Sequence, residues 1–145
     1  MITKYLPWVL LSVLVIIQFF QIEKTNPTVD PTLDFLETTQ APEKIAKLFK
    51  GACYDCHSYH TAFPAYTNFQ PLAWWIRGHI RGARQNLNFS EWQNIDEKKK
   101  NHDIQESIEV IGNKRMPLKS YGWMHKKGSL TAEDRATMID WLRTL

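Results

Sequence analysis

The stretch CYDCHS, Cys53–Ser58, contains the only two cysteines of this 145-residue chain, and a histidine directly follows the second of them. Thiols three positions apart with an adjacent imidazole occur in several chemically different kinds of site. The residues around the stretch must therefore decide which kind this is, and they also predict how the chain folds around it.

The residues in front of the motif predict an amphipathic helix. In APEKIAKLFKGACYDCH, residues 41–57, apolar side chains recur every three or four positions from Ile45 to Ala52. The next members of the same stripe are Cys53 and Cys56. We therefore expect both thiols on the buried face of a helix, at or near its C-terminal end.

Two of the possible sites fit this context poorly. A thiol–disulfide oxidoreductase places its attacking cysteine at a helix N-terminus, where the helix dipole lowers the thiol pKa, whereas here the helix precedes the cysteines. Structural zinc requires four ligands, usually in two pairs, and His57 cannot readily join Cys53 and Cys56 from the adjacent position. The remaining histidines are scattered along the chain: His60, His79, His102 and His125.

Covalent haem attachment uses every element of the motif. Two cysteines at a helix end face the same way, as thioether bonds to the two vinyl groups of one porphyrin require, and His57 is then placed to ligate the iron. The sequence therefore predicts one covalently bound haem c held by Cys53 and Cys56, with His57 as the proximal iron ligand.

The sixth iron ligand is predicted to be Met116. The following Pro117 disfavours helix at Met116, so the methionine stands in a loop from which its thioether can reach a metal. The main rival is His79, which lies on the apolar face of a predicted helix. Instead of ligating iron, His79 could be a buried, hydrogen-bonded side chain or a partner for a haem propionate. Met124 and His125 are further candidates because they lie close to Met116 in the sequence. His60 is another. His102 is expected to be exposed, and Met138 is expected to pack in the core.

The N-terminus predicts a membrane anchor. Tyr5–Ile22 is a run of apolar and uncharged residues, preceded by Lys4. Its length is close to the minimum for crossing the hydrocarbon of a bilayer, and the positive charge favours a cytoplasmic N-terminus. We therefore expect a single-pass signal-anchor over residues 1–22 in the cytoplasmic (inner) membrane. A linker over residues 23–40 and a haem domain over residues 41–145, on the periplasmic side, are expected to follow.

The soluble part is predicted to be all-α, with about five short helices. It contains 16 Lys and Arg against 11 Asp and Glu, a modest surplus without an arginine-rich stripe of interleaved aromatics, so nucleic acid is not an expected partner. Helices are indicated by apolar stripes from Leu72 to Ala83, from Ile104 to Ile111 and from Met138 to Leu145. Helix starts are indicated by capping-box patterns at Ser90 with Gln93 and at Thr131 with Asp134.

The helix that enters CxxCH, the Met-Pro loop and the closing helix resemble class I c-type cytochromes. CYDCHS, NFSEW and MPLKSYGWMH more closely resemble a family of small bacterial haem-binding domains. The resemblance covers residues 41–145. It implies a cytochrome c-like fold in which the first and last helices cross, with Phe49 against Trp141, and in which a proline carbonyl accepts the proximal imidazole N–H. Pro71 is the nearest match for that proline.

These observations predict a membrane-anchored monohaem c-type cytochrome that transfers single electrons to and from a partner protein, rather than an enzyme. The alternative is a haem enzyme or sensor, peroxidase-like or gas-binding, with an open or displaceable sixth iron position. Axial ligation by a thioether would raise the reduction potential relative to ligation by two histidines.

Overall fold

The chain is helical, as expected from its apolar stripes. The structure, a computed structural model, describes residues 2–145, and no strand occurs within that range, so the all-α prediction is confirmed there. The α-helices are α1 (Ile2–Ile17), α2 (Phe35–Thr38), α3 (Glu43–Ala52), α4 (Tyr54–His57), α5 (Leu72–Asn86), α6 (Glu97–Gly112), α7 (Lys119–Met124) and α8 (Ala132–Leu142). Short 3-10 helices lie between them: η1 (Pro31–Leu33), η2 (Ala65–Asn68), η3 (Phe89–Asn94) and η4 (Lys126–Gly128).

The core is built from aromatic rings where the first and last helices of the domain meet. Phe49 of α3 and Trp141 of α8 have ring centroids 5.6 Å apart, so the predicted contact between them is confirmed. Phe35 lies among four rings, with centroids 4.8 Å from Trp92, 5.0 Å from Phe89, 5.5 Å from Phe49 and 5.6 Å from Trp141. Met138 is fully buried beside them, which confirms its predicted packing role.

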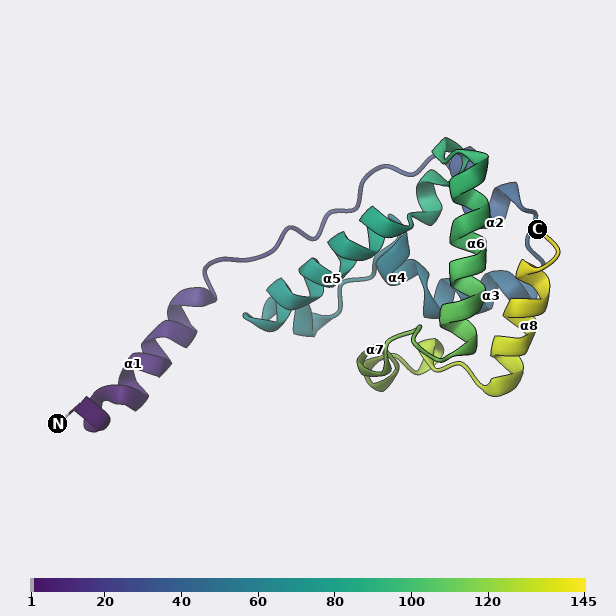
Figure 1. The fold of residues 1–145 in the computed structure, drawn as a ribbon. Helices are drawn as coiled ribbons and strands as arrows, with labels where there is room; N and C mark the ends of the chain where they lie inside the picture. The colour runs from purple at the N-terminus through teal and green to yellow at the C-terminus, as the bar shows by residue number, and fades with distance from the viewer. Residues whose placement is uncertain (1) are drawn as a thin grey trace.

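The segment predicted as a linker, residues 23–40, is only partly a linker. An extended stretch runs beside α5 and reaches the far end of the domain (Figure 1). There Asp34 caps α2 through Leu36 N–H and accepts a 2.8 Å hydrogen bond from the Tyr54 hydroxyl. Phe35 and Leu36 are buried. From Asp34 onward the segment therefore docks on the domain, because the burial of two large apolar side chains stabilises the docked arrangement.

The predicted transmembrane helix is not supported. No helix within residues 2–145 is long and apolar enough to cross a membrane. The helix α1 has 16 residues and ends at Ile17, which gives about 24 Å against the roughly 30 Å of a hydrocarbon core. This finding overturns the transmembrane anchor over residues 1–22 and the single-pass inner-membrane location.

The helix α1 ends at Ile17, before the apolar run ends at Ile22, because the last residues of the run form hydrogen bonds with the domain. The Gln18 side chain donates to the Gln70 carbonyl at 3.1 Å and accepts from the Gln70 amide at 2.9 Å. The Trp74 indole donates to the Phe20 carbonyl at 2.9 Å. The last of these bonds satisfies the Phe20 carbonyl, which a continued helix would have used itself. The helix α1 projects from the domain beyond these contacts (Figure 1).

Helix caps were predicted correctly at one position and incorrectly at another. Thr131 and Asp134 form the predicted capping box at the start of α8. Ser90 does not cap a helix: Asn88 caps η3, and the buried Ser90 hydroxyl accepts a hydrogen bond from the Tyr59 amide at 3.0 Å. A neighbouring loop therefore uses the hydroxyl group that the capping-box pattern had assigned to the helix.

Candidate functional site

The CxxCH motif lies at the boundary between α3 and the single-turn helix α4. Cys53 ends α3 and begins α4, with φ −126° and ψ −40°, and its carbonyl accepts hydrogen bonds from the amides of Cys56 (3.1 Å) and His57 (2.9 Å). Both thiols are free. The predicted placement of the cysteines at a helix C-terminus is therefore confirmed, with a second short turn that the stripe pattern did not resolve.

The thiols are not activated as nucleophiles. Loss of hydration raises the pKa of Cys53 to about 12 and the pKa of Cys56 to about 11; the neighbouring Cys56 and Asp55, respectively, add to these shifts. Reactive thiols in oxidoreductases have lowered pKa values, because the thiolate is the attacking species. The surroundings of the pair therefore oppose a thiol–disulfide function.

The imidazole of His57 is oriented by a backbone carbonyl. Its Nδ1 donates to the Leu87 carbonyl at 3.0 Å, which leaves Nε2 as the ring atom with a free lone pair. Burial lowers the pKa of His57, so the ring is held neutral. A neutral imidazole whose other nitrogen donates to a carbonyl is the usual form of a metal-ligating histidine.

The acceptor of this hydrogen bond is not Pro71. Leu87 follows the last turn of α5, whereas Pro71 precedes the first, so about 22 Å of helix separates them. The C-terminal end of α5, where Leu87 lies, approaches the CxxCH motif, and the N-terminal end, where Pro71 lies, does not. In this structure the hydrogen bond that the resemblance implied for the Pro71 carbonyl is therefore made by the Leu87 carbonyl.

Arg84 holds the chain directly after the motif. Its guanidinium donates to the Ser58 carbonyl (2.8 Å), to the Thr61 hydroxyl (2.9 Å) and to the Asn26 side chain (3.1 Å). It also lies over the Tyr59 ring, 5.1 Å from the centroid. One planar donor group therefore connects α5, the loop after His57 and the extended N-terminal segment.

An apolar cleft opens beside Cys56. Its volume is about 890 Å³, counting the open mouth, and α5 and α7 contribute much of its lining. Side chains that would normally be buried are exposed here: Trp75 at 50%, Met124 at 58% and Trp123 at 83%. Apolar surface gathered in a concave site of this size is typical of a binding site for a large apolar group.

A hydrogen-bonded cluster joins α7 to the motif at one side of the cleft. The Tyr121 hydroxyl donates to Asp55 Oδ2 at 2.6 Å, and its oxygen lies 3.2 Å from the Gly51 carbonyl oxygen. His125 packs on Tyr121, with ring centroids 4.3 Å apart, and its Nε2 is 3.0 Å from the Tyr66 hydroxyl. No sequence signal pointed to this cluster, because its partners lie 59 to 70 residues apart.

Replacing Tyr121 by Phe is expected to lower the free energy of unfolding by about 1–3 kcal/mol, because Asp55 Oδ2 loses its donor while remaining partly buried. Urea unfolding of the holoprotein measures the change. Tyr59→Phe is the matched control, since it keeps the ring under Arg84 and should change stability by less than about 0.5 kcal/mol. Equal effects of the two substitutions would contradict the assignment.

The candidate sixth ligands fall into two groups. His79, Met124 and His125 line the cleft together with Cys56, whereas Met116 is not among the lining residues. His79 is exposed rather than buried, and its Nδ1 bonds to the Trp75 carbonyl at 2.9 Å. His60 and His102 are exposed, the latter as expected.

Met116 lies in a loop, as its proline neighbour indicated, and its backbone is held on both sides. Its amide donates to the Val110 carbonyl at 3.0 Å, and its carbonyl accepts from Arg135 at 2.6 Å. Arg135 also donates to the Ile111 carbonyl at 2.8 Å, so it fastens the loop to the end of α6. The Met116 side chain is half-buried.

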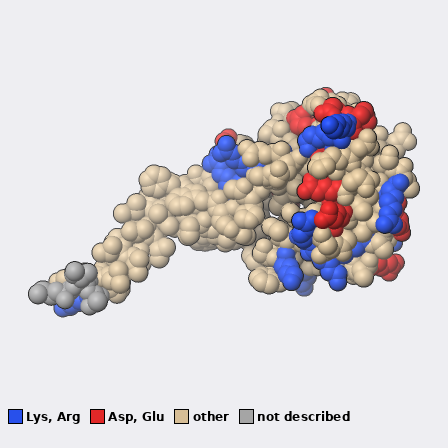
Figure 2. Space-filling view, viewed as in Figure 1, with Lys and Arg blue, Asp and Glu red and all other residues tan. Residues whose placement is uncertain are grey.

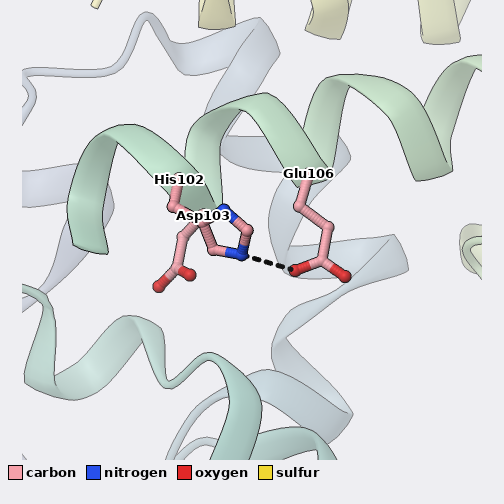
Figure 3. A group of neighbouring side chains, drawn as sticks. All are labelled: His102, Asp103 and Glu106. Carbon is pink, nitrogen blue, oxygen red and sulfur yellow. Dashed lines mark ion pairs between the residues drawn. The ribbon is translucent and has the colours of Figure 1, made fainter. Parts of the chain in front are cut away.

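A second group of possible metal ligands lies on α6 (Figure 3). His102 and Glu106 are exposed, with Nε2 and Oε2 3.8 Å apart, and Asp103 is adjacent. Lys99 donates to both carboxylate oxygens of the buried Asp103 at 2.8 Å. Because a lysine already neutralises the only buried member, this group is explained as a surface ion-pair cluster.

Comparison with known proteins identifies a family. A family model described as a haem-binding domain matches residues 12–144, which is nearly the whole chain. No curated protein and no solved structure matches the chain significantly. The matched range includes the CxxCH motif, the cleft and the loop that carries Met116.

Proposed function

This chain belongs to the haem-binding domain family, and from that premise we propose that it is a c-type cytochrome that binds one haem covalently and passes single electrons to and from a partner protein. The family assignment supports haem binding as such. The observation that carries the finer proposal is the arrangement of Cys53–His57: two free thiols at a helix end, followed by a neutral imidazole oriented by a carbonyl.

The residues present fit a covalent haem. Cys53 and Cys56 would supply the thioether sulfurs, and His57 would ligate iron through Nε2, the ring atom that Leu87 leaves free. The cleft beside Cys56 offers the apolar surface that a porphyrin covers. Bound there, haem supplies an iron that changes oxidation state by one electron.

The protein residues have three tasks in this proposal. The Leu87 carbonyl fixes the rotation of the His57 ring and raises its basicity as a ligand. The apolar walls, among them Trp75 and Ile76, exclude water and so favour the less charged, reduced state. Arg84 keeps the chain after His57 in place, so that the ring holds its position in both oxidation states.

We propose Met116 as the sixth ligand, and its replacement by Ala is expected to convert a low-spin ferric spectrum to a high-spin one. The sulfur-to-iron charge-transfer band should disappear, because that band requires a thioether on the iron. Visible spectroscopy of the purified holoprotein measures both changes. Met124→Ala, His79→Ala and His125→Ala are the parallel variants; loss of the band in one of them, with Met116→Ala unchanged, would reassign the ligand.

A second function is favoured by one observation: Met116 is not among the residues that line the cleft beside Cys56. An iron without a protein ligand on that side would bind small molecules such as a gas or peroxide, as in a sensor or a peroxidase-like enzyme. A high-spin ferric spectrum of the unmodified holoprotein, with binding of added cyanide at micromolar concentration, would support this function over electron transfer.

A further inference from the structure

A second hollow lies on the opposite side of α5 from the apolar cleft. It is a groove of about 1190 Å³, counting its open mouth. Three arginines of α5, at positions 77, 81 and 84, line it at spacings of four and three residues, which places them on one face of the helix. The remaining lining includes neutral hydrogen-bonding groups from the extended segment and the end of α5, among them Thr25, Asn26 and Gln85.

The arginines of this groove lack anionic partners, unlike several other basic residues of the domain. Within the residues described, no carboxylate lies within 4.0 Å of Arg77, Arg81 or Arg84. Glu23 is the acidic residue in the lining, and its carboxylate accepts a 2.7 Å hydrogen bond from Thr25. Basic residues elsewhere are paired: Lys47 with Glu43, Lys99 with Asp103, Lys100 with Glu97, Arg115 with Glu109 and Arg143 with Asp140.

An unpaired row of like charges costs stability. Guanidinium groups one helical turn apart repel each other, and the Glu23 carboxylate of the lining is more than 4.0 Å from all three of them, so solvent and salt provide most of the screening. An acidic surface seated in the groove would relieve it, and arginine binds carboxylates through two parallel hydrogen bonds. Figure 2 shows basic atoms, with acidic atoms at their edge, where the extended segment passes α5, apart from the charged residues on the α6 side.

The groove lies close to the proposed haem attachment. Ile80 lines both the groove and the apolar cleft, so α5 alone separates the two hollows. Arg84 donates to the carbonyl of Ser58, the residue that follows the proximal ligand His57. A protein docked in the groove would therefore stand one helix away from the cleft beside Cys56.

We propose that this groove is the docking site for a carboxylate-rich surface patch of the protein with which the domain exchanges electrons. The proposal rests on the electron-transfer function proposed above. Its recognition chemistry is that of Arg77 and Arg81, which are exposed and free to pair, with Arg84 as the fixed end of the row. Complementary charge of this kind acts mainly on the rate of encounter and on orientation.

The test compares two double variants with equal loss of charge. Arg77→Gln/Arg81→Gln removes two charges from the groove, and Lys98→Gln/Arg143→Gln removes two from α6 and the end of α8. Hexaglutamate is titrated calorimetrically into each full-length holoprotein at low ionic strength. Binding by the parent and by the second variant, with at least a tenfold weaker affinity in the first, is the expected result.

Electron exchange is then followed by stopped flow with two small oxidants of opposite charge. Oxidation of the reduced holoprotein by ferricyanide, an anion, should slow about fivefold in Arg77→Gln/Arg81→Gln and clearly less in the control. Oxidation by tris(phenanthroline)cobalt(III), a cation, should not slow. Hexaglutamate should inhibit the ferricyanide reaction of the parent and of the control variant, but not that of Arg77→Gln/Arg81→Gln.

The outcomes separate the two proposals. Equal affinity for hexaglutamate in both double variants, or no binding to the parent, overturns the docking site whatever the haem does. If both double variants slow the ferricyanide reaction equally, the effect comes from net charge alone, and the docking site is also overturned. A protein that binds hexaglutamate through Arg77 and Arg81 but does not exchange electrons contradicts the proposed function and leaves the acidic docking site standing.

Discussion

Replacing Cys53 and Cys56 together by Ala is expected to yield a protein that releases all of its haem into acidified organic solvent after denaturation. The unmodified protein should keep the pigment in the protein pellet. The reason is covalent: the two thiols are the only cysteines of the chain, so no other thioether is possible. Coexpression with a cytochrome c maturation system, followed by solvent extraction and absorbance of the pyridine haemochrome, measures the effect.

The single variants and a histidine control sharpen this test. Cys53→Ala or Cys56→Ala alone should retain pigment through one thioether, with the haemochrome band displaced toward longer wavelength because one vinyl group stays unsaturated. His102→Ala, an exposed histidine on α6, should behave like the parent. Extraction of the haem from the unmodified protein would show that it is not bound covalently, while leaving haem binding itself intact.

Replacing Phe35 by Ala is expected to destabilise the domain by about 3–5 kcal/mol, a large share of the roughly 5–15 kcal/mol that holds such a domain folded. The side chain is 1% exposed and touches the rings of Phe49, Phe89, Trp92 and Trp141. Its loss leaves a cavity that surrounding rings cannot easily fill. A lower urea midpoint with an unchanged slope is the expected measurement.

Phe69→Ala is the matched control for this substitution. Phe69 is 64% exposed, so the same chemical change should alter stability by no more than about 0.5 kcal/mol. If Phe35→Ala were as mild as Phe69→Ala, the segment before α3 would be a tether after all. A large difference instead places residues 34–38 within the folded unit.

Local patterns predicted the elements whose stability comes from neighbours in the chain. The stripe from Ile45 to Ala52 predicted α3, and Thr131 with Asp134 predicted the cap of α8. The apolar run after Lys4 was misleading, since hydropathy does not reveal where a helix ends. The end of α1 depends on hydrogen bonds between Gln18 and Gln70, which are 52 residues apart.

The same division runs through the candidate site. Cys53, Cys56 and His57 could be proposed as haem-binding residues from the sequence because their chemistry depends on their spacing along one short stretch of backbone. The carbonyl that orients His57 could not, because any of many backbone groups could reach it, and the packing of α5 selected Leu87 instead of Pro71.

By itself, the sequence determined the CxxCH motif, the helical character of the chain and the capped start of α8, since each of these depends on residues within a few positions of one another. Only the tertiary structure decided that Phe35 belongs to the core, that Tyr121 bonds to Asp55, and that α5 separates an apolar cleft from an arginine-lined groove. Those features arise from contacts between distant segments, and their energies depend on burial and geometry that no local pattern encodes.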